Sequence, residues 1–328
     1  MSLKYVLVAL SLVIIMITGC VSPNVKLFTD ATDPLQEFAI EGEGEGKILM
    51  IAVKGFISDY STKGLIKSEP SMVQEIVSQL HLAEKDPEIK AVMFTIDSPG
   101  GSVTASDMLY HEIMRYKEKT GCKVTAALMN VAASGGYYVA LPADYIIAHP
   151  TTVTGSVGVI FLRPKVYGLM EKIGVDVSVN TSGQNKDMGS PFREATEEEK
   201  EIFQTLTDSL GSRFTELVLK HREIDTKRFE EIANARIFLA KEAKDLGLVD
   251  DIGYLTDAVE KTKSLAGLPE DSKVVVYRRD KYPDDNLYNA QSQLSGGSLH
   301  LINLGLPDLE LLSQPGFYYL WPAGCNFK

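Results

Sequence analysis

Three short segments of this 328-residue chain combine small residues with polar groups that suit acyl-transfer chemistry. They are Asp-Ser-Pro-Gly-Gly at residues 97–101, Ala-Ala-Ser-Gly-Gly-Tyr-Tyr at 132–138, and Thr-Ser-Gly-Gln-Asn-Lys-Asp-Met-Gly-Ser-Pro at 181–191. Together they offer a hydroxyl to attack a carbonyl carbon, unobstructed amides to stabilise the resulting oxyanion, and an amine to accept a proton. Each segment also has a simpler structural explanation.

Ser134 lies among small residues at the point where a strand is followed by a helix. Its hydroxyl could simply cap that helix, and for a serine considered alone this is the better explanation. A nucleophilic serine at the same place would gain from the helix N-terminus, which favours negative charge, and from the unobstructed amide of Gly135. Both roles remain open on this observation alone.

The segment at 97–101 follows a buried strand that the sequence predicts at residues 90–96. Ligands of parallel α/β sheets bind beyond the carboxyl ends of the strands. A Pro-Gly-Gly turn at that place exposes backbone N–H groups, among them that of Gly101, as an oxyanion hole requires. Taken alone, the segment is more typical of an ordinary tight turn between a strand and a helix.

Lys186 lies in a loop rich in glycine and serine, where a lysine is normally a solvated surface charge. To act as a general base its amine must be neutral near neutral pH, which requires removal from water. The carboxylate of Asp187 would favour the charged amine, so the hypothesis requires Asp187 to point away. A Ser-His-Asp triad is the poorer alternative, because none of the five histidines lies in a context that suggests a catalytic base.

The composition is that of a globular protein, with 45% apolar and 23% charged residues. A formal net charge of −11, without any run of lysine or arginine, argues against a nucleic-acid-binding protein. Only three cysteines are present, Cys20, Cys122 and Cys325, and no two lie close enough to suggest a zinc or iron–sulfur motif. We therefore expect neither a metal nor a cofactor.

The first residues are typical of an export signal. An uncharged apolar run at residues 5–17 follows Lys4 and is shorter than a membrane-spanning helix. It ends in Ile-Thr-Gly-Cys, which resembles the lipobox of bacterial lipoproteins, so residues 1–19 would be a cleaved signal peptide and Cys20 would carry the lipid. The alternative is an uncleaved anchor in which Cys20 is incidental. In both cases we expect the remaining chain outside the cytoplasm and tethered to a membrane.

The pattern after residue 44 predicts the scaffold that must position these groups. Residues 20–44 are polar and glycine-rich, as in a tether. Strands and helices then alternate over residues 45–277, which predicts a single α/β domain with a largely parallel sheet covered by helices. Strands are expected at 47–53, 90–96, 123–129, 145–148, 157–162 and 175–180, and helices at 70–84, 103–119, 132–141, 163–173 and 196–221.

Two further features concern the later part of the chain. Thr196, followed three residues on by Glu199, predicts a capping box for the long helix at 196–221. The alternating pattern ends at residue 278, so residues 278–328 are expected to form a C-terminal extension. Its aromatic cluster at 317–321 is either a mobile end or an arm that packs on a neighbouring subunit.

The three segments, in this order, resemble those of the signal peptide peptidase A family, also called protease IV. The resemblance covers residues 45–255 and includes Thr-Val-Thr-Gly-Ser-Val-Gly-Val at 152–159 and the stretch at 236–253. It implies the crotonase-like, Clp-protease-like spiral of ββα units, in agreement with the alternation described above. Ala235 and Ala240 depart from it, because the family often has glycine there.

The resemblance also implies roles for individual residues. Ser134 would be the nucleophile, Lys186 the general base, and Ser156 the hydroxyl that orients the lysine, while Gly101 and Gly135 would supply the oxyanion donors. One copy of each motif is present, as in half-length members of the family. In those members the subunits form a homo-oligomeric ring, and the lysine comes from the neighbouring protomer.

The resulting hypothesis is a membrane-tethered serine endopeptidase that uses a Ser–Lys dyad to cut extended apolar peptides such as remnant signal peptides. A cleft lined by glycine and alanine would favour small or aliphatic side chains next to the cut. A crotonase-type acyl-transfer enzyme shares the fold, but would be expected to lack the Ser134–Lys186 pair and to work in the cytoplasm. The third alternative is a catalytically silent surface lipoprotein, although such a scaffold has no physical need for all five site residues.

Overall fold

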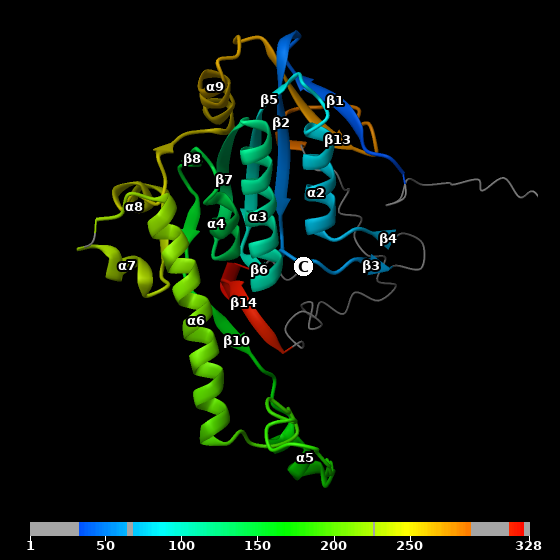
Figure 1. Ribbon diagram of the computed structural model, residues 1–328, viewed down its shortest axis with the longest axis vertical. Coiled ribbons are helices and arrows are strands. Elements are labelled where there is room, and N and C mark those ends of the chain that lie inside the picture. The colour runs from blue at the N-terminus through cyan, green and yellow to red at the C-terminus, as the bar shows by residue number, and fades with distance from the viewer. Residues whose placement is uncertain (1–32, 64–67, 226, 290–314, 325–328) are drawn as a thin grey trace, which may run out of the picture.

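The centre of the protein is a mostly parallel β-sheet with helices on both faces (Figure 1). The computed structural model describes residues 33–63, 68–225, 227–289 and 315–324. The strands lie in the order β1-β13-β2-β5-β7-β8-β12, and β9 pairs with both β7 and β11. Neighbours from β13 to β12 run parallel, whereas β1 and β11 pair antiparallel with the strands beside them.

The bounds of the elements are as follows. The strands are β1 (Gln36–Glu41), β2 (Gly44–Lys54), β3 (Thr62–Lys63), β4 (Ser68–Glu69), β5 (Ile89–Ser98), β6 (Gly100–Ser102), β7 (Lys123–Ala133), β8 (Tyr145–Ala148), β9 (Val153–Gly155), β10 (Ile160–Leu162), β11 (Ile237–Leu239), β12 (Asp251–Ile252), β13 (Ser272–Arg278) and β14 (Gly316–Leu320). The helices are α2 (Met72–Ala83), α3 (Val103–Thr120), α4 (Gly135–Ala140), α5 (Tyr167–Ile173), α6 (Glu197–His221), α7 (Phe229–Ala233), α8 (Ala240–Asp245) and α9 (Leu255–Ala266), with short 3₁₀ turns η1 (Leu287–Asn289) and η2 (Pro322–Gly324).

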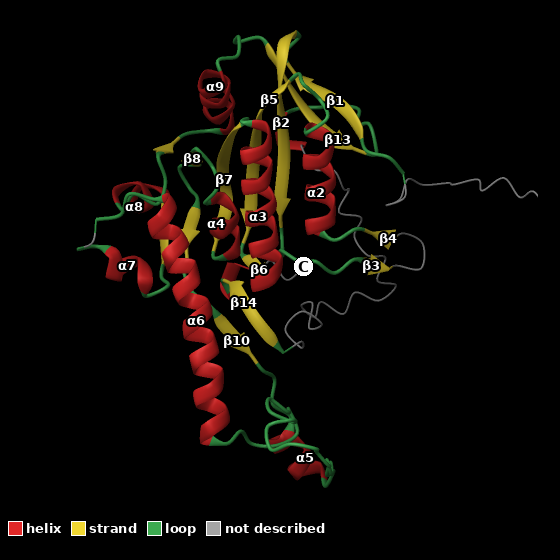
Figure 2. Cartoon of the chain, viewed as in Figure 1, coloured by secondary structure: helices red, strands yellow, loops and turns green. Residues whose placement is uncertain are grey.

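Strand β2 shows how the sheet is buried on both faces. Successive side chains of a strand point to opposite sides, so its near-continuous apolar sequence supplies two cores. Leu49 and Ile51 belong to the core on the face covered by α2 and α3, whereas Ile48 and Met50 belong to the core that α9 covers. Figure 2 shows α2 and α3 lying alongside each other over the strands. The fold predicted from the alternation, a helix-covered α/β sheet, is confirmed.

The parallel pairing of β5 with β7 brings the two candidate segments together. The register runs from Ala91–Lys123 to Ser98–Ala132, so both strands reach the same edge of the sheet. The turn at 98–101 leaves one strand there, and Ser134 follows the end of the other. The carboxyl edge of the sheet is therefore where the site is assembled, as the general rule for parallel sheets requires.

A second, smaller sheet lies below this edge, in the order β10-β14-β6. All of its pairings are antiparallel, and β14 lies between the other two strands. Beyond β10 the chain extends away from the body through α5 and returns along the long helix α6 (Figure 2). We refer to residues 163–196, which include α5, as the extension. Its apolar side chains are unusually exposed, since Leu169 and Ile173 are 62% and 63% accessible.

Several predicted elements agree with the structure. The capping box at Thr196 and Glu199 is present, and so is an equivalent one at Ser71 and Gln74 that begins α2. The strand predicted at 145–148 is formed as β8. The helix predicted at 132–141 is shorter, because β7 continues to Ala133 and α4 begins only at Gly135.

Two predicted strands and both chain ends differ from expectation. Residues 175–180 form no strand: Val175, Val177 and Val179 alternate as in a strand but are about half exposed, since no described strand pairs with them. Of the strand predicted at 157–162, only residues 160–162 are formed, as β10. The predicted tether contains β1, which pairs with β13, and the predicted C-terminal extension contributes β14 to the second sheet.

The export signal and Cys20 lie outside the described residues, and so does Cys325. Within the described ranges, no helix has both the length and the apolar character needed to cross a bilayer.

Ala235 provides a test of local backbone strain. Its φ angle is +61°, in the left-handed region that costs a residue with a Cβ about 1 kcal/mol relative to glycine. We therefore expect Ala235→Gly to raise the free energy of unfolding by about 1 kcal/mol, as measured by thermal or denaturant unfolding. Ala233→Gly, at the end of α7 in helical backbone, is the matched control and should lower stability by about 0.5 kcal/mol. A loss of stability in both variants would contradict this account.

Candidate active site

Ser134 occupies a strained turn between β7 and α4. Its φ and ψ angles are 53° and −118°, a combination that residues with a side chain rarely adopt. The backbone holds it there, because the Ser134 N–H donates to the Gly155 carbonyl at 2.8 Å and its own carbonyl accepts from Tyr138 N–H at 2.9 Å. Such strain persists only where surrounding contacts enforce it, and it is concentrated at functional sites.

The hydroxyl of Ser134 is buried, with the residue only 1% exposed, and it has no hydrogen-bond partner among the described residues. It makes no capping hydrogen bond to α4, so the simpler explanation of this serine as a helix cap is wrong. A buried polar atom without a partner is rare and calls for a reason. The hydroxyl is therefore free to bond to a group from outside the described residues.

The glycines after Ser134 allow α4 to approach the end of β5. A Cβ added to Gly135 would lie 2.6 Å from Ser106 Oγ, and one added to Gly136 would lie 2.5 Å from the Ser98 carbonyl oxygen. Both distances are shorter than any real Cβ contact, so a larger residue would push the helix away. The N-terminus of α4 is therefore fixed close to the Pro-Gly-Gly turn.

Ser98 holds that turn in shape. Its Oγ donates to the Gly55 carbonyl at 2.6 Å and accepts from the Gly100 N–H at 3.1 Å, in a fully buried position. Gly100 has a φ of +103°, and a Cβ on it would lie 2.8 Å from the amide nitrogen of Gly135. The turn that carries Gly101 is thus in direct contact with the residue after Ser134. The sequence analysis did not assign Ser98 a role, although a small polar residue directly before Pro-Gly-Gly was the available signal.

Ser156 lies close to Ser134 through the backbone. It follows β9, and the Gly155 carbonyl directly before it is the acceptor of the Ser134 N–H. Ser156 also has a positive φ, 54°, and its own N–H donates to the Arg236 carbonyl at 2.8 Å. It is 8% exposed. The structure therefore brings together Ser134, Ser156, Gly135 and the turn at Gly101.

Lys186 is not brought to this place within one chain. It is exposed, in the loop between α5 and α6, which lies at the far end of the extension from α4 (Figure 1). Asp187, its neighbour in sequence, accepts from Arg193 with both carboxylate oxygens, at 2.8 and 2.9 Å. Hydrogen bonding from Arg193, which also pairs with Glu199, lowers the pKa of Asp187, so the carboxylate is charged and bound to a cation other than Lys186. Asp187 is thus committed to Arg193, as the lysine hypothesis requires.

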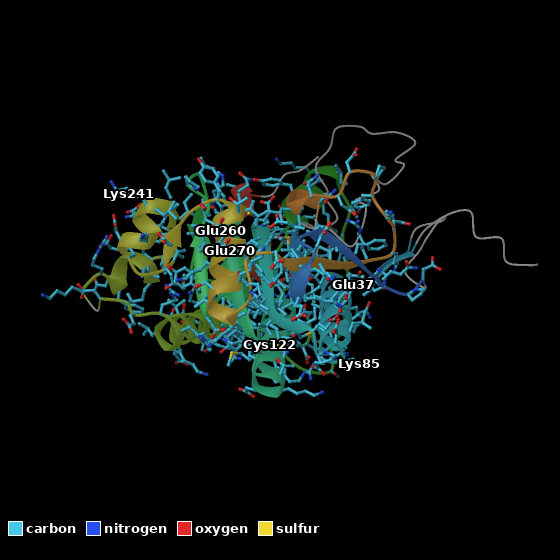
Figure 3. All side chains as sticks on the ribbon, turned by 90° about the horizontal axis from the view of Figure 1, so that it is seen from above. Glu37, Lys85, Cys122, Lys241, Glu260 and Glu270 are labelled. Atoms are coloured by element: carbon cyan, nitrogen blue, oxygen red, sulfur yellow. The ribbon has the colours of Figure 1, made fainter. Side chains whose placement is uncertain are left out.

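Cys122, the cysteine within the described residues, lies away from the site. The Sγ atom of Cys122 lies 3.4 Å from the Ile89 carbonyl oxygen. Figure 3 shows this cysteine at the end of the protein near Lys85. In the same view Glu260 lies beside Glu270, and Lys241 lies on the opposite side of the protein from Lys85. No group of three or more histidine, cysteine or carboxylate side chains in the described part of the chain is arranged to hold a metal ion.

Comparison with known proteins agrees with this geometry. The family model described as Clp protease matches residues 65–156, and that of peptidase family S49 matches residues 116–269. A buried, strained serine at the carboxyl edge of a Clp-protease-like sheet, beside glycine amides, defines a serine peptidase. The chain belongs to peptidase family S49, as the relatives described next establish.

The chain is 36% identical to a protein of Enterococcus faecium named as a signal peptide peptidase SppA, over 78% of this chain and 74% of that protein. It is 32% identical to protease 4 of Haemophilus influenzae over 91% of this chain, but over only 49% of protease 4. It is also 32% identical to the chloroplastic serine protease SPPA of Arabidopsis thaliana, over 71% of this chain and 34% of that protein. The chain thus spans about half the length of protease 4.

Substitution of Ser98 tests the role of the turn. Ser98→Ala removes the acceptor of the Gly100 N–H and the donor to Gly55, so the turn should lose its fixed orientation. We expect kcat for peptide cleavage to fall about tenfold or more with a smaller change in KM, because oxyanion donors act in the transition state. Ser272→Ala is the control, since Ser272 is equally buried and donates to the Glu45 carbonyl at 2.7 Å at the amino end of the parallel strands, and its loss should lower only stability, by about 1 kcal/mol. Equal losses of kcat in the two variants would contradict a specific role for Ser98.

Proposed function

We propose that this protein is a membrane-tethered serine endopeptidase that cuts extended apolar peptides, in particular remnant signal peptides, with a Ser–Lys dyad shared between subunits. The observation that carries the proposal is Ser134, a buried and strained residue beside two glycine amides, whose hydroxyl has no hydrogen-bond partner among the described residues of its own chain. Family S49 supplies the class of reaction, which is hydrolysis of a peptide bond by a serine peptidase.

In this mechanism Ser134 Oγ attacks the carbonyl carbon of the substrate, and its proton passes to the neutral amine of Lys186 from a neighbouring copy. The N–H groups of Gly101 and Gly135 stabilise the oxyanion of the tetrahedral intermediate. The protonated lysine then gives its proton to the leaving amine, and the C–N bond breaks to leave an acyl ester on Ser134. Water hydrolyses the ester with the same lysine as base, and the Ser156 hydroxyl orients that lysine. The mechanism needs no cofactor.

The exposed extension supports a base supplied by another subunit. Lys186 lies in it, and so do Leu169, Ile173 and Phe192, which are 47–63% exposed. Clusters of exposed large apolar side chains usually mark a surface that another protein covers. A homo-oligomeric ring would bury these side chains and would remove the lysine from water, which is the condition for a neutral amine.

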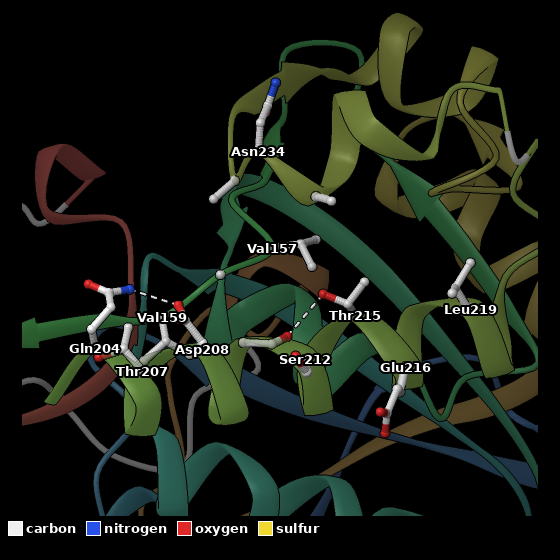
Figure 4. A pocket seen from close by; sticks show the side chains of 14 residues that line it. Val157, Val159, Gln204, Thr207, Asp208, Ser212, Thr215, Glu216, Leu219 and Asn234 are labelled. Atoms are coloured by element: carbon white, nitrogen blue, oxygen red, sulfur yellow. Dashed lines mark hydrogen bonds between the residues drawn. The ribbon is translucent and has the colours of Figure 1, made fainter. Parts of the chain in front are cut away.

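An open pocket of about 560 Å³ lies next to Ser156 and leaves room for such an approach (Figure 4). Val157 and Val159 line one side and α6 the other, with Asp208 and Ser212 directed toward the space. The end of the pocket is lined by Ala233, Asn234 and Ala235. We propose that the lysine-bearing loop of the neighbouring subunit reaches Ser156 and Ser134 from this side.

The proposed tether would hold the site near the membrane. Strand β1 begins at Gln36, so 15 residues separate Cys20 from the first strand. Such a segment spans at most roughly 55 Å when fully extended. A peptidase held at that distance would meet apolar peptides as they leave the bilayer. Neither a silent scaffold nor a cytoplasmic acyl-thioester enzyme explains an export signal together with a strained serine, whose backbone costs about 1–3 kcal/mol to maintain.

The first test uses the full-length chain in detergent with an apolar peptide of signal-peptide sequence, followed by mass spectrometry. Ser134→Ala and Lys186→Ala should each reduce cleavage by at least about a thousandfold, because the two groups act as a unit. Lys172→Ala, another exposed lysine of the same extension, should leave cleavage unchanged. Undiminished cleavage by Ser134→Ala would refute the mechanism, and so would an active Lys186→Ala variant with the assembly of the unaltered chain.

Mixing the two inactive variants tests whether the dyad is shared between subunits. In a random equimolar ring, roughly one site in four combines an intact serine from one subunit with an intact lysine from the next. We therefore expect the mixture, after dissociation and reassembly, to regain about a quarter of the activity of the unaltered protein. Each variant treated alone is the control. A mixture that stays inactive although mixed assemblies are detected would show that both groups come from the same chain.

A further inference from the structure

Strand β7 changes partner shortly before it reaches Ser134. Residues 125–128 pair with β8, and residues 131–133 pair with β9. The two residues between these stretches belong to neither register. The second pairing is the one that matters for the site, because it leads directly into the hydrogen bond from the Ser134 N–H to the Gly155 carbonyl.

A β-bulge in the same strand makes this change of partner possible. On its other side β7 pairs with β5, and the register jumps between Ile96 and Ser98. Between them Asp97 alone lies opposite residues 129–131, so β7 carries two extra residues at this point. Bulges are concentrated beside active sites, where they redirect a side chain.

Two extra residues, rather than one, leave the two faces of the strand unchanged. Successive side chains alternate between the faces, so a single extra residue would turn the end of β7 over. Leu128 before the bulge and Ala132 after it belong to the same core, on the face that α2 and α3 cover. The end of β7 therefore moves from β8 to β9 and still packs the same side against the helices.

Asp97 supplies an acceptor at the bulge. The Val131 N–H donates to Asp97 Oδ1 at 3.2 Å. Backbone donors inside a fold are almost always paired, because an unpaired one costs about as much as a lost hydrogen bond. The backbone of Asp97 is itself fixed, since its carbonyl accepts from the Gly55 N–H at 2.9 Å and β5 pairs with β2. The carboxylate thus ties β7 to a fixed position in the centre of the sheet.

Two threonines hold the other side of the bulge. The hydroxyl of Thr152 donates to the carbonyls of residues 128 and 129, the first at 2.8 Å. The hydroxyl of Thr154 donates to the Ala132 carbonyl at 2.6 Å. Both threonines are fully buried. They lie in the same short segment as the carbonyl that accepts from the Ser134 N–H.

Asp97 and Ser98 have complementary roles at the end of β5. Neighbouring residues of a strand point to opposite faces. Ser98 holds the glycine turn through the Gly100 N–H, whereas Asp97 holds the strand that carries Ser134. The Asp-Ser-Pro-Gly-Gly segment therefore fixes the two halves of the site, the glycine amides and the serine, relative to each other.

We propose that Asp97, assisted by Thr154, is a positioning residue for the nucleophile. Its side-chain oxygen holds the bulge of β7 and so keeps Ser134 aligned with the amides of Gly101 and Gly135. The acceptor atom matters more than its charge, because the bulge N–H requires one oxygen at this place. Asparagine presents such an oxygen at the same distance from the backbone, whereas alanine presents none. The inference rests on the proposed function, since it takes Ser134 as the attacking group.

The amino end of β7 offers a matched control. There Asp144 Oδ2 accepts from the Val124 N–H at 2.8 Å, so a second carboxylate holds the same strand by the same kind of bond. Asp144 also forms an ion pair with Lys117. Its removal should therefore disturb the protein at least as much as the removal of Asp97, but at the edge of the sheet remote from Ser134.

Amide hydrogen exchange tests the hold on the bulge without relying on catalysis. Exchange into the full-length chain in detergent is followed by mass spectrometry with fragmentation to single amides. Asp97→Ala should speed exchange at residues 131–134 at least about tenfold, whereas Asp97→Asn should stay within about threefold of the unaltered chain. Asp144→Ala should speed exchange at residues 123–125 instead. Unchanged protection of residues 131–134 in Asp97→Ala, or equal losses in the alanine and asparagine variants, would overturn the proposal.

Peptide cleavage tests whether this hold matters for the reaction. With the apolar peptide as substrate, Asp97→Ala should lower kcat about tenfold or more and change KM less than about twofold, because a misplaced nucleophile acts on the transition state. Asp97→Asn should keep kcat within about threefold, and Asp144→Ala should leave kcat unchanged. A raised KM with unchanged kcat in Asp97→Ala, or an equal loss of kcat in Asp144→Ala, would rule out the positioning role.

A second pair of variants decides the matter if Asp97→Ala does not fold. Thr154→Val removes the hydroxyl that donates to the Ala132 carbonyl and keeps the shape of the side chain, whereas Thr154→Ser keeps the hydroxyl. We expect the valine variant to show the faster exchange at residues 131–134 and a kcat lowered about tenfold, and the serine variant to resemble the unaltered chain. Indistinguishable valine and serine variants would count against the proposal.

Failure of this inference and failure of the proposed function give different results. Exchange is measured whether or not the enzyme cuts peptides, so an inactive unaltered chain would refute the proposed function while exchange still decides what holds the bulge. Cleavage by the unaltered chain, combined with a fully active Asp97→Ala variant, would retain the peptidase and reject Asp97 as a positioning residue.

Discussion

The backbone at Ser134 is the constraint on which the site depends. This one residue must end β7, begin α4 and direct its N–H to the Gly155 carbonyl, and only a positive φ satisfies all three requirements. The turn is so tight that Gly135 and Gly136 have no room for a Cβ against Ser106 and Ser98. Because the hydroxyl is thereby turned away from the helix it precedes, it cannot act as a cap. Strain, close packing and a buried hydroxyl without a partner among the described residues are consequences of the same geometry.

A similar strained serine follows β9, the strand that pairs with the end of β7. Ser156 has nearly the same φ as Ser134, 54° against 53°, and its N–H donates to the Arg236 carbonyl. The backbone hydrogen bonds therefore form a chain from β7 through β9 to the segment before β11. The Arg236 carbonyl fixes Ser156, and Gly155, directly before Ser156, holds Ser134.

Much of the scaffold could be predicted from the sequence, because its signals are local. The apolar runs of the parallel strands, the capping box at Thr196 and the position of Ser134 after a strand each depend on a few adjacent residues. The failures share one cause, which is that pairing between distant segments leaves no local trace. Val175, Val177 and Val179 have the period of a strand, but no described strand lies beside them. Conversely, β1 and β14 lie in segments whose composition resembles a tether and a tail.

The distribution of the catalytic groups has a similar explanation. Sequence order shows that Ser134 and Lys186 are 52 residues apart, but only the fold shows that the extension carries the lysine away from the serine. Ser98 was overlooked because its function is to hold a backbone turn, and a buried serine in such a role has no distinctive spacing.

The proposed supply of the lysine by a neighbour sets a condition on activity. Lys186 lies exposed in the extension, where its amine is solvated, so an unassembled subunit would have a serine without a neutral base. Assembly would bring the lysine to the serine and remove it from water at the same time. A peptidase that accepts many apolar sequences would then be restrained until it is assembled.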